Sequence, residues 1–180
     1  INPIDLVIKY GADATRFGLL WQAGEGQDMR FGEADILAGK KFSNKIWNAS
    51  RFVFGMIDEN TVKEMPQNFS ETDKEILEDL EKTVKIANES ISKFRFDAAI
   101  QEIYHFFWHK FCDKYIEEAK ERIKNPKSEE DKKTAQFVLW KVLLDSLKLL
   151  HPFIPFVTET IYQKMPGRPG RALIAEKWPE

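Results

Sequence analysis

Apolar residues recur every three or four positions along most of the chain, which is the spacing that places them on one face of an α-helix. Ser70 and Asp73 imitate a capping box, with Asp in the place of Glu or Gln, and predict where the clearest amphipathic helix begins. Its apolar stripe contains Ile76, Leu80, Val84, Ala87, Ile91 and Phe94. A second helix, predicted to be capped by Asp97, has a stripe of Ile100, Ile103, Phe107, Phe111, Tyr115 and Ala119.

A third long helix is predicted to start at a Ser128 cap and to bury Ala135, Val138, Val142 and Leu147. Because only the short segment KNPKSEED separates it from the helix before, the two are expected to pack antiparallel. The two prolines of HPFIPF turn the chain, and a short helix restarts at Pro155 and ends near Met165. After a Gly/Pro segment, ALIAEKW is predicted to form a strand.

The N-terminal part of the chain predicts shorter elements. Asn2-Pro3 marks a helix start and Gly11 a helix stop, and Asp13 is expected to cap the helix that follows. Residues 24–32 then form a connecting loop, a helix spans about 33–58, and 59–69 is a polar linker. The predicted fold class is all-α, a helical bundle with a short C-terminal strand-like tail.

Composition narrows the kind of protein. With 180 residues, 43% hydrophobic and 31% charged, the chain fits one globular domain. The single cysteine, Cys112, excludes an internal disulfide framework and a cysteine-only zinc site. No window holds 18 consecutive apolar residues and no secretory signal is present, so a cytoplasmic protein without membrane contact is expected. The chain starts at Ile1 rather than Met, and we expect it to be a piece of a longer protein.

Charge is segregated between elements although the net charge is only −2. Residues 38–57 contain Lys40, Lys41, Lys45 and Arg51 and no carboxylate, whereas residues 71–82 contain six acids and two lysines. One interpretation is that the basic helix and the acidic helix match each other inside the molecule. The other is that the basic helix binds an external polyanion.

The basic helix contains FSNKIWNASRFVF, in which a 3.6-residue period aligns six residues that we call the polar stripe: Lys41, Asn44, Lys45, Asn48, Arg51 and Phe52. Asparagine is a poor helix former, so two asparagines four residues apart indicate that their amides contact something. Lysine and arginine bind phosphate, and a partly exposed phenylalanine stacks on an unpaired base. The pattern suits single-stranded RNA. The alternative is that Asn44 and Asn48 bond to neighbouring helices and Phe52 is part of the core.

Other candidate chemistry is weaker. His105, His109 and Cys112 share a helix face with the reach of metal ligands, but no fourth ligand follows, and a core or surface role is favoured over a metal site. The nearby acids, which are best explained as a solvated face, are Asp113, Glu117, Glu118 and Glu121. Gly-rich phosphate loops, G-x-S-x-G and paired catalytic carboxylates are absent from the sequence, so no catalytic residue is predicted.

Several ordered motifs resemble one family. The run from NPIDLVIKYGADATRF through FSNKIWNASRFVF closely resembles the part of valyl-tRNA synthetases, which are class Ia aminoacyl-tRNA synthetases, that follows the KMSKS loop. WHKFCDKYIEEAK, LHPFIPFVTETIYQ and AEKWPE resemble later elements of the same family. GADATRF and HPFIPF also occur in isoleucyl- and leucyl-tRNA synthetases, whereas GQDMRF followed by the asparagine-containing helix indicates valine.

The resemblance implies a division of the chain into three parts. Residues 1–32 would be a stem-contact segment following the catalytic domain, 33–165 the helical anticodon-binding bundle, and 166–180 an extended tail leading toward a coiled coil. The implied function is to bind the anticodon arm of valine tRNA. The implied partners are that tRNA and the catalytic domain of the same polypeptide, in a monomer.

The same resemblance locates chemistry elsewhere. The HIGH and KMSKS motifs that bind ATP precede this region in the family and are not in these residues, so the chain is not expected to activate valine. The parent enzyme would ligate valine to tRNA with ATP and Mg, and this part would hold no cofactor.

Family contacts carried over by position are assigned to Lys45, Arg51, Phe52 and Ile116, the last packing against an anticodon base. Helical geometry adds Lys41, Asn44 and Asn48. Ala34 and Asp35 stand where relatives commonly carry basic residues, so a contact there is expected to be lost. Two alternatives stay open: the same module of an isoleucyl or leucyl enzyme, and a helical protein-interaction domain without RNA binding.

Overall fold

A computed structural model describes residues 2–23 and 32–179, and most of these residues are in helices. The α-helices are α1 Pro3–Tyr10, α2 Ala12–Trp21, α3 Glu33–Phe54, α4 Glu71–Ser92, α5 Phe96–His105, α6 Ile116–Lys124, α7 Glu129–Leu150 and α8 Pro155–Lys164. A π-helix, η2, spans Phe106–Tyr115, and 3₁₀ turns form at η1 Thr61–Lys63 and η3 Leu173–Ala175. The predicted all-α fold is confirmed. The predicted loop over residues 24–32 lies almost wholly outside the described residues.

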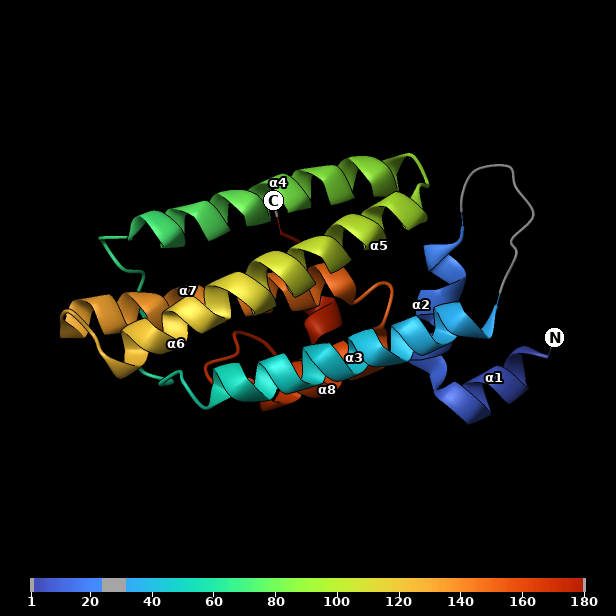
Figure 1. The fold of residues 1–180 in the computed structure, drawn as a ribbon, viewed down its shortest axis with the longest axis horizontal. Coiled ribbons are helices and arrows are strands. Elements are labelled where there is room, and N and C mark those ends of the chain that lie inside the picture. Colours follow the sequence, from blue (N-terminus) through green and yellow to red (C-terminus); the bar gives the residue numbers. More distant parts are fainter. Residues whose placement is uncertain (1, 24–31, 180) are drawn as a thin grey trace.

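The helices pack as an elongated bundle (Figure 1). α5, η2 and α6 follow one another without a break and form one long rod. α4 lies along one side of this rod and α3 along the other, with α7 and α8 behind, while α1 and α2 cap one end. α6 and α7 are antiparallel neighbours, as predicted from the short connection between them.

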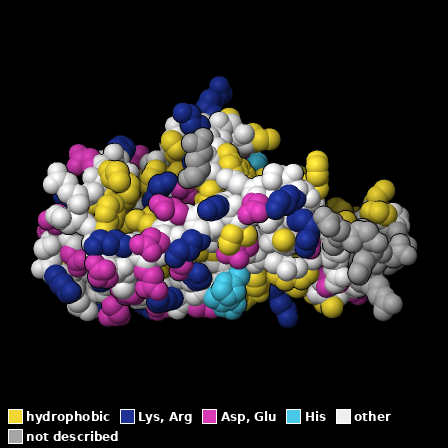
Figure 2. All heavy atoms as spheres, turned by 90° about the horizontal axis from the view of Figure 1, so that it is seen from above, with side chains coloured by type: hydrophobic (Ala, Val, Ile, Leu, Met, Phe, Trp, Pro, Cys, Tyr) yellow, Lys and Arg dark blue, Asp and Glu magenta, His cyan; other side chains and the backbone are white. Residues whose placement is uncertain are grey.

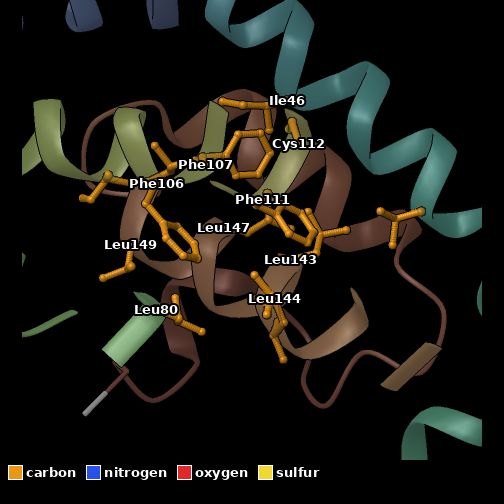
Figure 3. Close-up of a cluster of buried hydrophobic side chains, with 14 of the residues drawn as sticks. Ile46, Leu80, Phe106, Phe107, Phe111, Cys112, Leu143, Leu144, Leu147 and Leu149 are labelled. Atoms are coloured by element: carbon orange, nitrogen blue, oxygen red, sulfur yellow. The ribbon is translucent and has the colours of Figure 1, made fainter. Parts of the chain in front are cut away.

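The core is built from the rod and α7, with contributions from α3 and α4 (Figure 3). Phe106, Phe107 and Phe111 of η2 are fully buried against α7, most of whose apolar residues are also buried. Ile46 of α3 and Leu80 of α4 close the cluster from opposite sides. Removing this much apolar surface from water is the main force that holds the bundle together.

Two of the four predicted helix caps are confirmed. Ser70 Oγ accepts from Asp73 N at 3.2 Å while Asp73 Oδ2 accepts from Ser70 N at 2.9 Å, which completes the capping box of α4. Ser128 Oγ accepts from Asp131 N at 3.1 Å and caps α7.

The other two predicted caps are wrong. α2 begins directly after Gly11, and Asp13 instead accepts from Phe156 N at 3.2 Å and Val157 N at 2.7 Å, so it caps α8. α5 begins at Phe96 without a side-chain cap, and Asp97 pairs with Arg95. That guanidinium lowers the pKa of Asp97.

The predicted C-terminal strand is also wrong. ALIAEKW forms the 3₁₀ turn η3, and no strand is present among residues 2–23 and 32–179. The backbone here bonds to side chains of α8, because Glu159 Oε2 accepts from Leu173 N at 2.9 Å and Gln163 Nε2 donates to Arg171 O at 2.6 Å. With its backbone groups satisfied by a helix, this segment has no neighbouring strand to pair with.

A buried ionic network joins α4, η2, α6 and α7. Asp73 is fully buried and accepts two bonds from Arg122, at 2.7 and 3.0 Å, and one from Tyr115 Oη at 2.5 Å. Arg122 also donates to Asp131 Oδ1 at 2.8 Å. Burial alone would raise the pKa of Asp73, but the bonds from Arg122, Tyr115 and Ser70 outweigh it and hold that pKa below its ordinary value.

Replacing Asp73 by Asn should lower the free energy of unfolding by about 3 kcal/mol, because it removes one of the two carboxylates that compensate the mostly buried Arg122 and leaves only Asp131. Since the folded pKa is depressed, the stabilisation is complete above the ordinary carboxyl pKa of about 3.9 and is lost as the pH falls below it. Urea unfolding at pH 7 and pH 3 measures both effects. Glu71→Gln, at an exposed pair with Lys74, should change stability by less than about 0.5 kcal/mol.

α2 and α3 approach unusually closely through two glycines. A Cβ on Gly18 would lie 2.9 Å from Ile36 N, and one on Gly39 would lie 2.8 Å from Ala14 O. Both neighbours are backbone atoms, so they cannot move aside without separating the helices. The contact fixes the N-terminal helices against the start of α3.

Gly39→Ala should therefore destabilise the domain by about 1–3 kcal/mol, since α2 and α3 must separate to admit the methyl group. Gly55→Ala is the matched control because its Cβ would have 3.5 Å of clearance at a φ of −72°. The control should be neutral or stabilising by up to about 1 kcal/mol. Equal denaturation midpoints for the two variants would contradict the close approach.

No helix in the described part of the chain is both long enough and apolar enough to cross a membrane.

Candidate nucleic-acid interface

The polar stripe lies on the solvent side of α3. The helix buries Ile36, Phe42, Ile46 and Val53 against the bundle, at steps that follow one face. Lys41, Asn44, Asn48 and Arg51, which fall on the other side, are exposed. The 3.6-residue period therefore predicted this face correctly.

Phe52 and the two asparagines do not play the structural roles that the alternative gave them. The Phe52 side chain is 41% exposed, so it is not a core residue. Asn44 and Asn48 are exposed, and neither bonds to another helix within residues 2–23 and 32–179. The amides and the aromatic ring are available to an external ligand.

Lys45 is only partly exposed and is already engaged. Its Nζ lies 2.9 Å from Asp113 Oδ1 of η2 and 5.1 Å from the centroid of the Trp108 ring. Both partners are on the π-helix, which faces this part of α3. An ion pair that is partly open to solvent is worth under about 1 kcal/mol, so a phosphate can compete with Asp113 for this lysine.

Lys120 is a second cation at this surface, and the sequence did not indicate it. Its Nζ lies 5.7 Å from the Phe52 ring centroid and 3.1 Å from Glu117 Oε2. It lies in α6, four residues after Ile116, and residues four apart share a helix face. Extending the helical face of Ile116 by one turn in the sequence would therefore have identified Lys120 as a candidate. Phe52 and Lys120 together offer an aromatic face with a cation beside it.

Ile116 lies where a base cannot pack against it in this structure. Its side chain is 4% exposed and belongs to the hydrophobic core beneath α6. The structure therefore places Ile116 in the core, and its contact with an anticodon base stays a prediction.

The intramolecular charge match accounts for α4 and leaves most of α3 unmatched. Glu75 pairs with Lys114 of η2 at 2.5 Å and Asp79 with Lys110 of η2 at 3.0 Å. The other paired acids of residues 71–82 use lysines of α4 itself or Arg122 of α6, and within the described residues none of these acids pairs with α3. Figure 2 shows positive and negative side chains interspersed on the face seen from above, where α4 lies. On α3, no ion pair forms with Lys40, Lys41 or Arg51 in the part of the chain that the structure describes.

The first turn of α3 contributes no cation. Asp35 Oδ2 accepts from Gly32 N at 3.3 Å and so supports the helix start, and Ala34 is exposed. Glu33 pairs with Lys9 of α1 at 3.2 Å. Acidic residues suit a helix N-terminus, and any polyanion would be directed further along the helix.

The metal alternative is not supported by the geometry. Cys112 is buried, and burial raises the pKa of its thiol to about 12, whereas metal binding needs the thiolate. His105 and His109 are exposed, with ring centroids 5.2 Å apart. Within the described residues, no three His, Cys, Asp or Glu side chains are arranged to hold a metal ion.

A helical bundle with an exposed row of amides, cations and one aromatic ring has the features of an all-helical RNA-binding domain. The sequence profile of the anticodon-binding domain of tRNA ligases matches residues 73–180, which is more than half of the chain. The chain belongs to this family of anticodon-binding domains.

Similar proteins are valine–tRNA ligases. That of Thermotoga maritima is 44% identical over 181 residues, that of Fusobacterium nucleatum 41% over 171, and that of Aquifex aeolicus 35% over 192. These alignments cover 100%, 91% and 100% of the chain but 20%, 19% and 16% of the relatives. The chain thus spans about a fifth of the length of the curated relatives it matches.

Asn44→Ala and Asn48→Ala should each raise the free energy of unfolding by about 0.5 kcal/mol, because alanine is the better helix former and no internal bond is lost. Both should weaken tRNA binding. Asn88→Ala is the control: its Oδ1 accepts from Trp178 Nε1 at 2.6 Å, so the lost bond offsets the gain in helix propensity and that variant should not be stabilised. Thermal unfolding measures the change in stability of each variant, and a tRNA titration measures its change in affinity. A loss of stability at Asn44 or Asn48 would show that the asparagine has a structural role.

Proposed function

We propose that the chain is the tRNA-binding module of a valine–tRNA ligase and that α3 reads the anticodon arm of valine tRNA. The observation that carries the proposal is the polar stripe, which combines amides, cations and a 41% exposed phenylalanine on one face without a carboxylate of its own. Folding gives no reason for this combination, since asparagine lowers helix propensity and an exposed aromatic ring gains little from burial. Single-stranded RNA supplies phosphates, base edges and stacking faces that match it.

Each residue of the surface has a distinct part in this proposal. Phe52 stacks on an unpaired base beside Lys120, and Arg51 bonds to phosphate or a base edge. Lys45 and Lys41 contact phosphates and position the loop, while the amides of Asn44 and Asn48 bond to base edges. Ile116 supports this surface from the core.

The rest of the parent protein would supply the chemistry. We infer that a catalytic domain in the same polypeptide ligates valine to the bound tRNA with ATP and Mg, because the chain spans only 20% of the Thermotoga maritima valine–tRNA ligase that it matches. Residues 1–32 would join the two parts. Ile4, Val7 and Ile8 are exposed on one face of α1, which suits contact with such a domain. We propose a monomeric cytoplasmic enzyme.

The test is a filter-binding titration of the chain, at one low salt concentration, with valine tRNA and with the same tRNA altered only in its anticodon. We expect a clear preference for the valine anticodon and a slope of log affinity against log salt of about −3, from four phosphate contacts at about 0.7 each. Phe52→Ala should weaken binding at least about fivefold through lost stacking. Phe156→Ala, which removes another exposed ring on α8, should not.

Equal binding of the two tRNAs would reduce α3 to a charged docking surface. Tighter binding of an isoleucine or leucine tRNA would assign the module to one of those enzymes. Failure to bind any tRNA, or binding whose affinity does not change with salt, would favour a helical protein-interaction domain.

A further inference from the structure

Asp113 uses both of its carboxylate oxygens in a contact to which neither the resemblance nor the proposed function gives a role. Oδ1 lies 2.9 Å from Lys45 Nζ, and Oδ2 lies 3.3 Å from Nδ1 of His109. The carboxylate thus links the cation of the polar stripe to an imidazole on η2. One carboxylate between a lysine and an imidazole can be held by either of them.

The surroundings of His109 are open and polar. Within residues 2–23 and 32–179, the titratable or charged groups that face it are Asp113 on η2, Lys45 on α3 through that carboxylate, and His105 and Tyr104 on α5. The ring centroids of His105 and Tyr104 lie 5.2 and 6.4 Å from that of His109. His109 is exposed, so a ligand lying on α3 beside Lys45 can reach it.

The helix geometry at this position is unusual. π-Helical turns are rare and occur frequently at functional sites, yet η2 extends over ten residues, Phe106–Tyr115. Trp108 of the same segment lies under Lys45, with its ring stacked at 6.2 Å and 19° on Phe42 of α3. The π-helix therefore brings Trp108 and Asp113 against Lys45 of α3, and His109 lies beside them through its contact with Asp113.

We propose that Asp113 is an exchangeable partner, which holds Lys45 when the surface is empty and passes to protonated His109 when an RNA phosphate takes Lys45. The inference rests on the proposed tRNA-binding function and adds His109, with His105 beside it, to the RNA-binding surface. No covalent bond changes. One proton is taken from solvent onto the imidazole as the complex forms.

The direction in which RNA affinity changes with pH follows from the charges near His109. An RNA phosphate brings negative charge to the imidazoles, and release of Lys45 leaves the Asp113 carboxylate uncompensated beside His109. Both changes favour the imidazolium, which is the form that donates to a carboxylate. Because the complex holds more protons than the free protein, affinity rises as the pH falls through the ordinary imidazole range near 6.5.

The experiment measures valine-tRNA affinity of the 180-residue chain at pH 6 and pH 8 and constant ionic strength. We expect binding at pH 6 to be tighter by about sixfold, the ratio produced when complex formation moves one imidazole titration by one pH unit. His109→Gln, which keeps a hydrogen-bonding group but no titration, should remove most of this ratio. Asp113→Asn should tighten tRNA binding at pH 8, because Lys45 is freed. It should also reduce the dependence of affinity on pH.

Asp79→Asn is the matched control for the change in net charge. It releases Lys110, which also lies on η2 but pairs with α4, so the pH 6 to pH 8 ratio should stay that of the unaltered chain. Proton NMR gives a second measurement, since the chain has only three histidines. On adding tRNA, the His109 titration should move to higher pH, while His151, bonded to Thr158 Oγ1 at 2.9 Å, serves as the internal reference.

Binding that is equally tight at both pH values, with an unmoved His109 titration, would overturn the exchange and leave the proposed function standing. An Asp113→Asn variant that behaves like Asp79→Asn would overturn it as well. Absence of tRNA binding at either pH would remove the proposed function itself and this inference with it.

Discussion

The geometry of the bundle depends on the buried pairing of Asp73 with Arg122 and Tyr115. Asp73 is in the first turn of α4, Tyr115 ends the π-helix, and Arg122 lies near the end of α6, so one carboxylate joins three elements of the fold. Burying the ions has a large desolvation cost, which only complete hydrogen bonding offsets. The same bonds explain why the pKa of the Tyr115 hydroxyl is raised, with burial as the larger cause. Anchoring Tyr115 also fixes the rotation of η2, and hence which of its side chains face α3.

The π-helix η2 contributes side chains both to the core and to the surface that faces α3. From Ile103 the buried residues follow at steps of four, as Phe107, Phe111, Tyr115 and Ala119. In a 3.6-residue helix this row would drift by about 40° per step and leave the core within a few turns. A π-helix turns less per residue than an α-helix, so the π-helical turns offset this drift and keep the row on the core side, while His105, His109 and Asp113 lie outside it.

Sequence predicts what depends on neighbours along the chain and fails where partners come from far away. The Ser70 and Ser128 caps bond within their own helices, and the polar stripe follows from one helical period, so both were predictable. Asp13 instead caps a helix 143 residues further on, which no local pattern encodes. Lys120 is beside Phe52, and Asp113 beside Lys45, only because α6 and η2 pack near α3. Ile116 matched a motif, but packing put it in the core.

Near-neutral net charge does not prevent a protein from attracting a polyanion to one helix. Two acids of α4, Glu75 and Asp79, are matched at 2.5–3.0 Å by lysines of η2, and such close pairs cancel at a distance. Beyond about one Debye length, roughly 10 Å at 0.1 M salt, only uncompensated charge is felt, and on α3 that charge is positive. In the proposed function the two asparagines add specificity, because charge attracts any RNA whereas amides read base edges. The helix propensity that α3 loses at Asn44 and Asn48 would then be the cost of contacts that the folded chain does not make for itself.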